Sequence, residues 1–192
     1  MAADPTGRVS PGVGMAEPEL YARLVEAAGR IAASEGDPSA RLAPLCDALW
    51  DALAPLGVSW IGFYLADGAE TTGSEPREMV LAARRDKPAC SPIGMHGACG
   101  QSFLEEAIRL IEDVELLGAG YIACDPRDRS EVVIPIYRSG SVWGVLDADS
   151  HRVSCFSVSD AEGLASVLMA AGLLDRSLPL RANRLQDRAG TV

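Results

Sequence analysis

The sequence predicts an α+β fold built around an antiparallel sheet. Two helical segments, a run of strand segments broken by two long loops, and a closing helix predict it. A chain of 192 residues suits one domain with a sizeable core. We expect that domain at residues 17–175, between a disordered tail at 1–16 and a polar tail at 176–192.

Two helices open the domain. Apolar residues recur at intervals of three and four between Pro18 and Ile31, and proline suits the first turn of a helix. A second apolar stripe spans residues 42–53, and Pro55 and Gly57 end it. We therefore expect two consecutive amphipathic helices.

Strand patterns fill the middle of the chain, and a helix closes it. The expected strands span residues 58–66, 78–84, 110–114, 131–137 and 142–149. The last two form the clearest hairpin, and a short helix is expected at 101–109. Ser159 and Glu162 have the spacing of a capping box, which marks the start of the closing helix.

Composition excludes several classes of partner. The formal net charge is −10 and no basic cluster interrupts it, so nucleic-acid binding is disfavoured. The N-terminal residues lack the apolar core of a signal peptide. The longest apolar run, at 165–174, is shorter than the roughly 20 residues that span a membrane. We expect a cytoplasmic protein, in which the five cysteines are reduced unless a disulfide is transient or catalytic.

Two long loops hold the cysteines of greatest interest. Loops of more than about 12 residues in a compact domain are usually functional or disordered. Cys124 lies in the loop at 118–130, where an accessible thiolate could act as a nucleophile, although the carboxylate of Asp125 disfavours that thiolate. The alternative is that Cys124 is an incidental small residue.

Cys90 and Cys99 lie in the other loop, at 86–100. With Cys124 and His96 they could form a zinc site, but no C-x-x-C pair is present, which favours redox chemistry with Cys90 or Cys99 as resolving thiol. We therefore expect no metal and no cofactor. The other two cysteines are interpreted as core (Cys46) and as structural or incidental (Cys155).

Two carboxylates share one face of the last strand. Asp147 and Asp149 are two residues apart, and Trp143 and Val145 on the same face favour burial. Two close carboxylates in a pocket repel each other, so one can retain its proton near neutral pH. Such a pair can also hold an ammonium group, whereas the simpler alternative is a solvated strand end.

Three further residues are candidates for the same pocket. Glu131 begins the preceding hairpin strand, either near the pocket or in solvent. Trp60 and Tyr64 share a face of their strand, where they form part of the core or pack against a small apolar group.

Several segments together resemble one family. The segments are Trp60-Ile61-Gly62-Phe63-Tyr64, Cys90 to Gly100, Ile122-Ala123-Cys124-Asp125, Ser130-Glu131-Val132-Val133 and Gly144-Val145-Leu146-Asp147-Ala148-Asp149-Ser150. In this order they closely resemble the free methionine-(R)-sulfoxide reductases, which are GAF-domain enzymes. The likeness runs from about Glu19 to Leu174.

The resemblance implies a GAF fold, with helices on one face of a central antiparallel sheet and ligand-binding loops on the other. It implies that Cys124 attacks free methionine sulfoxide, releases methionine and becomes a sulfenic acid. Cys90 would then resolve the sulfenic acid, with Cys99 as the alternative, and thioredoxin would restore the dithiol. The family often forms dimers, which this sequence neither supports nor opposes.

The resemblance also assigns the pocket residues. Glu131, Asp147 and Asp149 match the family's carboxylates, and Trp60 and Tyr64 match its aromatic positions. A sulfoxide sulfur is a sluggish electrophile until its oxygen is protonated or strongly hydrogen-bonded, and a protonated carboxylic acid does both.

The chain departs from the family pattern at two places. Tyr121 replaces a common histidine, and the span from Cys90 to Cys99 is one residue shorter, with Met95-His96 in place of a Gly-Arg-like pair. An alternative function is a non-catalytic GAF module that senses a small molecule or oxidants.

Overall fold

The computed structural model describes residues 17–66, 77–120 and 124–183. Its helices are α1 (Pro18–Ser34), α2 (Pro38–Leu53), α3 (Ala98–Glu105) and α4 (Val158–Ala170), with short 3₁₀ segments η1 (Ala54–Leu56) and η2 (Val114–Gly120). Its strands are β1 (Trp60–Ala66), β2 (Glu78–Arg85), β3 (Ile93–Gly94), β4 (Ile108–Ile111), β5 (Ser130–Arg138), β6 (Ser141–Ser150) and β7 (Leu180–Asn183).

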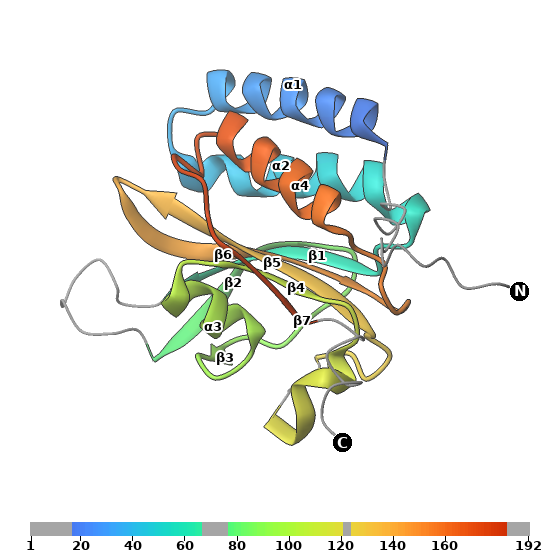
Figure 1. The fold of residues 1–192 in the computed structure, drawn as a ribbon. Coiled ribbons are helices and arrows are strands. Elements are labelled where there is room, and N and C mark those ends of the chain that lie inside the picture. The colour runs from blue at the N-terminus through green and yellow to red at the C-terminus, as the bar shows by residue number, and fades with distance from the viewer. Residues whose placement is uncertain (1–16, 67–76, 121–123, 184–192) are drawn as a thin grey trace, which may run out of the picture.

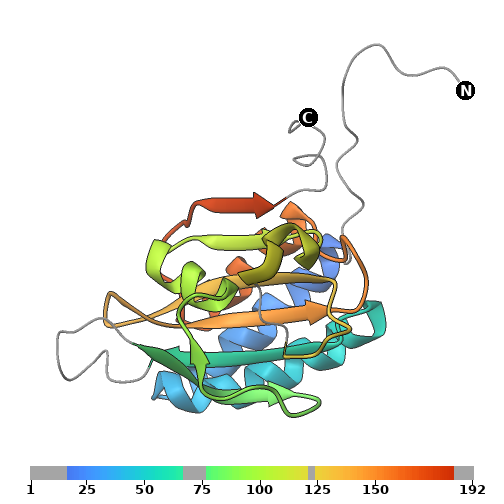
Figure 2. The ribbon, with the colours of Figure 1, turned by 90° about the horizontal axis from the view of Figure 1, so that it is seen from below.

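The strands form one sheet in the order β3-β2-β1-β6-β5-β4-β7. Neighbouring strands are antiparallel except β4 and β7, which are parallel, so the sheet is mixed at this edge. Helices α1, α2 and α4 lie on one side of it, whereas α3 lies on the other with β3 and the loops (Figures 1 and 2). The predicted α+β class is confirmed. None of the helices that the structure describes has the length and apolar character needed to cross a membrane.

Both faces of the central strands are buried, and they serve different cores. On β1, Ile61 and Phe63 join the larger core beneath α1, α2 and α4. Trp60 and Tyr64 alternate with them and join a smaller core beneath α3 and the loops. The candidate site lies in this smaller core.

The cap of α4 differs from the predicted one. Ser157, not Ser159, is the N-cap, and its side chain accepts the backbone N–H of Asp160 at 3.2 Å. The Asp160 carboxylate accepts the Ser157 N–H at 2.8 Å and also the Tyr21 hydroxyl of α1 at 2.9 Å. Asp160 therefore both completes the capping box and joins two helices, which Glu162 does not do.

Two predicted boundaries were wrong around α3. The helix spans 98–105 instead of 101–109, because Glu106 adopts a left-handed conformation (φ 47°) that ends it. The strand that follows is correspondingly early, at 108–111 instead of 110–114.

The predicted C-terminal tail contains a strand. β7 runs beside β4, and its residues Leu180 and Ala182 pack partly buried against the larger core. Backbone N–H groups at both ends of β4 bond to this segment, Ile108 to Pro179 and Glu112 to Asn183. The other predicted tail residues, 184–192 and 1–16, lie outside the described part of the chain.

Candidate active site

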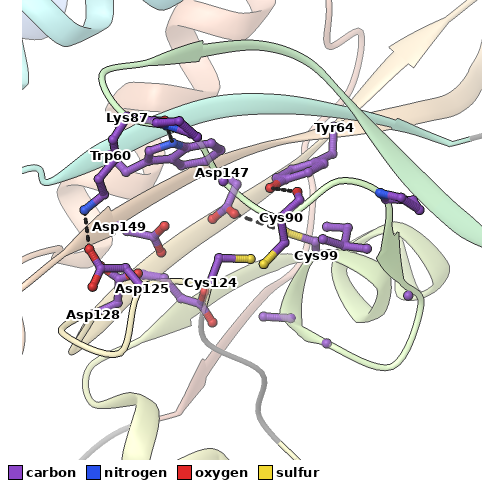
Figure 3. Close-up of a pocket in the computed structure, with 18 of the residues that line it drawn as sticks. Trp60, Tyr64, Lys87, Cys90, Cys99, Cys124, Asp125, Asp128, Asp147 and Asp149 are labelled. Atoms are coloured by element: carbon purple, nitrogen blue, oxygen red, sulfur yellow. Dashed lines mark hydrogen bonds and ion pairs between the residues drawn. The ribbon is translucent and has the colours of Figure 1, made fainter.

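A cavity of about 250 Å³ lies between the sheet and the loops on its α3 side. Figure 3 shows the side chains that surround it. All the site residues expected from the sequence line this cavity: Trp60, Tyr64, Cys90, Cys99, Cys124, Glu131, Asp147 and Asp149. The sheet supplies the aromatic and carboxylate groups, and the loops and the start of α3 supply the cysteines.

Strand register brings the carboxylates together. Glu131 on β5 is directly opposite Asp149 on β6, and Asp147 follows on the same face two residues away. One carboxylate oxygen of each lies within 4.8 Å of the others. Gly62 of β1 faces Asp147, and a Cβ atom there would lie 2.4 Å from the Trp60 ring, so glycine leaves room for the indole.

Burial makes Asp147 and Asp149 weak acids. It raises the pKa of Asp147 to about 7, against an opposing effect of the hydrogen bond from Cys99. It also raises the pKa of Asp149 well above the ordinary range, and repulsion from Asp147 and Glu131 adds to this. Oδ1 of Asp147 has no hydrogen-bond partner among the described residues. The cluster can therefore hold a proton near neutral pH, with burial as the main cause and repulsion as the second.

The loop cysteines separate into a pair and a single thiol. Cys90 and Cys124 are exposed free thiols, and the Cys124 thiol forms hydrogen bonds with the side chain and backbone of Cys90. Their sulfur atoms point toward each other in Figure 3. Cys99 is buried, and its thiol donates to Oδ2 of Asp147 at 3.2 Å. Among the described residues, the cysteines and His96 do not form a group of three or more whose ligand atoms all lie within 4.8 Å of one another.

Two of the pocket thiols, those of Cys124 and Cys99, favour the protonated form. Partial burial, followed by the hydrogen bond to Cys90, raises the pKa of Cys124 to about 12. Burial and then the charge of Asp147 raise the pKa of Cys99 well above its usual value. Asp125, which the sequence singled out as disfavouring the Cys124 thiolate, is not a leading cause.

The two aromatic residues hold the loop that carries Cys90. Their ring centroids lie 5.9 Å apart, and both side chains are buried. Nε1 of Trp60 donates to the carbonyl of Lys87 at 3.1 Å, and the Tyr64 hydroxyl donates to the carbonyl of Cys90 at 2.9 Å. Each ring therefore forms part of the cavity wall and also positions the loop.

Sequence reasoning missed a charged group at one side of the cavity. Lys87, Asp125 and Asp128 line it, and His151 contacts all of them. Arg127 and then Lys87 hold the pKa of Asp125 well below its usual range, whereas burial raises that of Asp128. These residues lie in loops or just after a strand, where no periodicity identifies them.

Of the two segments that depart from the family pattern, the structure describes the span from Cys90 to Cys99. His96 lines the cavity, and the adjacent Met95 packs so closely on α3 that a Cβ atom at Gly100 would lie 2.2 Å from its carbonyl oxygen. Tyr121 lies outside the described residues.

Comparisons with known proteins place this fold and cavity in a family. No protein-family model matches the chain. GAF domain-containing protein A of Dictyostelium discoideum is 32% identical over 151 residues, covering 78% of this chain and 89% of that protein. The free methionine-R-sulfoxide reductase of Escherichia coli K12 is 33% identical over 156 residues, covering 80% and 87% respectively.

A solved structure extends the likeness to three dimensions. The free methionine-R-sulfoxide reductase from Neisseria meningitidis, in complex with its substrate, superposes with a TM-score of 0.70 at 31% identity, covering 81% of this chain and 89% of that one. The predicted GAF-like fold is thereby confirmed. The chain belongs to the free methionine-R-sulfoxide reductases, a family of oxidoreductases with the GAF fold.

Proposed function

We propose that the protein reduces free L-methionine-(R)-sulfoxide to L-methionine, with Cys124 as the nucleophile. The observation that carries the proposal is the meeting of the Cys124 and Cys90 thiols at a cavity that also holds three clustered carboxyl groups. The names of the relatives support the substrate. A cavity of about 250 Å³ suits a single amino acid better than a folded polypeptide.

The first step transfers the substrate oxygen to Cys124. The carboxyl cluster of Glu131, Asp147 and Asp149 donates a proton or a strong hydrogen bond to the sulfoxide oxygen, which makes the sulfur electrophilic. Cys124 loses its proton to a carboxylate of the cluster and attacks the sulfoxide sulfur as its thiolate. The oxygen, with the proton donated to it, moves to the Cys124 sulfur, so a new S–O bond forms there as the substrate's S–O bond breaks. The substrate gains two electrons and leaves as methionine, and Cys124 loses two and becomes a sulfenic acid.

The second stage restores the thiols. The Cys90 thiol attacks the sulfur of the Cys124 sulfenic acid, a disulfide forms, and the hydroxyl leaves as water with the thiol proton. Thioredoxin, a dithiol, then reduces this disulfide by exchange and becomes oxidised itself. We favour Cys90 over Cys99 because Cys90 contacts Cys124, whereas the Cys99 thiol bonds to Asp147.

Two further predictions follow from this chemistry. A thioredoxin-recycled disulfide requires a reducing compartment, so we place the protein in the cytoplasm. The homodimer implied by the resemblance stays a prediction.

Methionine release from each epimer of free methionine sulfoxide tests the proposal. With thioredoxin recycling, we expect turnover of the R epimer alone and its loss in Cys124→Ser. Cys90→Ser should release about one methionine per chain and then stop, since the sulfenic acid cannot be resolved. Cys46→Ala, which alters a cysteine buried in the larger core, is the matched control.

Absence of turnover in folded, reduced protein would overturn the enzyme proposal. The alternative, a non-catalytic GAF sensor, predicts that methionine sulfoxide or an oxidant changes the protein without product release. Calorimetric binding of the R epimer in the Cys124→Ser variant separates a failure to bind from a failure to react.

A further inference from the structure

The loop that carries Cys90 and the loop that carries Cys124 meet without backbone pairing. Among the residues that the structure describes, no backbone hydrogen bond joins 86–92 to 124–129. A disulfide requires Cβ atoms about 4 Å apart and a restricted dihedral angle. Besides the hydrogen bonds between Cys124 and Cys90 themselves, side-chain contacts must therefore fix the relative position of the two loops.

Lys87 and Asp125 supply such a contact. Nζ of Lys87 forms an ion pair with Oδ2 of Asp125 (Figure 3). Lys87 lies three residues before Cys90 in one loop, and Asp125 directly follows Cys124 in the other. The two side chains are only 28% and 13% exposed. Solvent and salt screen such a sheltered pair less than they screen an exposed one.

Lys87 and Asp125 each also form hydrogen bonds with residues near their own loop. The carbonyl of Lys87 accepts the indole N–H of Trp60 on β1. Oδ1 of Asp125 accepts the backbone N–H and the Nε–H of Arg127, both at 3.0 Å. Nε2 of His151, just after β6, lies 3.4 Å from both Nζ of Lys87 and Oδ2 of Asp125. The ion pair thus connects two loops that are each fixed to the rest of the fold.

The choice of lysine at this position is distinctive. Lys87 is the only lysine in the chain, in which every other Lys or Arg position is an arginine. An ammonium is a compact point charge, whereas a guanidinium is a planar fork that favours two parallel bonds. Arg127 already forms two parallel bonds to Asp125, from Nε to Oδ1 and from Nη2 to Oδ2, so a compact cation suits the space that remains beside Oδ2.

We propose that the Lys87–Asp125 ion pair docks the Cys90 loop on the Cys124 loop and thereby accelerates disulfide formation between the two cysteines. Lys87 and Asp125 are positioning residues, because they act through the cysteines. The inference rests on the proposed function for the roles of Cys90 and Cys124. The step it accelerates forms the S–S bond, breaks the S–O bond of the sulfenic acid and releases water.

Peroxide oxidation of the full-length reduced chain tests this without methionine sulfoxide. Hydrogen peroxide oxidises Cys124 to the sulfenic acid and releases water, and mass spectrometry after quenching then follows the Cys90–Cys124 disulfide. We expect Lys87→Met and Asp125→Asn each to slow disulfide formation by about tenfold, because misplaced groups react slowly, while sulfenic acid forms at the wild-type rate. The double variant should be no slower than either single one, since both remove the same interaction.

Two controls isolate the charge at Lys87. Arg85→Met removes a cation from the end of β2, where Arg85 pairs with Asp47 of α2, and should leave disulfide formation unchanged. Acetylation of the single lysine removes its charge, whereas reductive methylation keeps it, and both reagents also modify the N-terminal amine. We expect only the acetylated protein to be slow.

Two results would overturn the proposal. One is disulfide formation at the wild-type rate in Lys87→Met, and the other is an equal slowing in Arg85→Met. In the first case, a raised KM for methionine sulfoxide would make Lys87 a partner of the substrate carboxylate instead. If the protein did not act on methionine sulfoxide, the proposed function would be refuted. The ion pair could still be tested, because hydrogen peroxide and not methionine sulfoxide oxidises Cys124 in this assay.

Discussion

The Cys99 thiol donates a hydrogen bond to Oδ2 of Asp147, and this bond opposes the rise in the Asp147 pKa that burial causes. The bond stabilises the ionised carboxyl because a carboxylate accepts hydrogen bonds more strongly than a carboxylic acid does. Cys99 thus influences the protonation of the cluster without forming a disulfide.

We predict that Cys99→Ala raises the Asp147 pKa above about 7. If the protonated cluster activates the sulfoxide, activity declines as the pH rises through this pKa. The alkaline limb of kcat/KM should therefore move to higher pH by up to about one unit. Cys99→Ser keeps a donor and should move the limb less. Loss of thioredoxin-dependent turnover in Cys99→Ala would instead identify Cys99 as the resolving cysteine.

The residues that the sequence identified share a simple pattern or a motif. Asp147 and Asp149 are two apart on a strand, so their common face followed from strand geometry. Lys87, Asp128 and His151 could not be found this way, because they lie outside periodic elements and meet only through tertiary contacts. The partner of the Cys99 thiol was equally hidden, since it depends on how α3 packs on β6.

At the scale of elements, the start of α4 joins local capping to tertiary packing. Ser157 and Asp160 exchange hydrogen bonds at the N-terminus of the helix, and Asp160 also accepts the Tyr21 hydroxyl. We predict that Ser157→Ala lowers the free energy of unfolding by about 1 kcal/mol, the usual value of an N-cap.

Urea unfolding of Ser157→Ala beside Ser159→Ala measures this effect. Ser159 is exposed inside the helix, so its replacement should change the stability little. A larger loss in Ser159→Ala than in Ser157→Ala would contradict the cap assignment.

Long periodic elements were predictable, whereas short ones were either shifted, as α3 and β4 were, or missed, as β3 and β7 were. The order of helices, strands and the β5–β6 hairpin followed from apolar periods of three to four and of two residues. β3 and β7 have two and four residues, too few to establish a period, and each exists because a neighbouring strand offers an edge to pair with. Capping residues shifted the predicted boundaries of α3 and α4 by a few positions.

At the scale of the whole molecule, the buried carboxyl groups of the pocket reduce the free energy of unfolding when they ionise. The chain has a formal net charge of −10, and its central strands hold buried carboxyl groups from Glu131 and Asp147. Ionising a buried carboxyl costs free energy unless a cation or several hydrogen bonds compensate it. The proposed catalysis by a weak acid requires that burial, and the hydrophobic contacts around the site stabilise the fold against its cost.

We therefore predict that stability depends on the protonation of Asp147. Its pKa is about 7 in the folded chain and near 3.8 when unfolded, so the folded chain binds this proton more tightly. The contribution of Asp147 is fully present below the unfolded pKa and is lost as the pH rises through the folded one. One unit of pKa shift corresponds to about 1.4 kcal/mol, so the loss amounts to a few kcal/mol by about pH 8.

Asp147→Asn separates this effect from the titration of other carboxyl groups, because it removes one ionisable group and preserves the shape of the side chain. We expect the variant to gain stability relative to wild type between about pH 5 and pH 8, as measured by urea unfolding. Asp175→Asn, at an exposed carboxyl paired with Arg176, is the matched control and should show no such gain. If Asp147→Asn and wild type follow the same curve, the ionisation of Asp147 is not costly in the fold, and Asp147 would not serve as a proton donor at neutral pH.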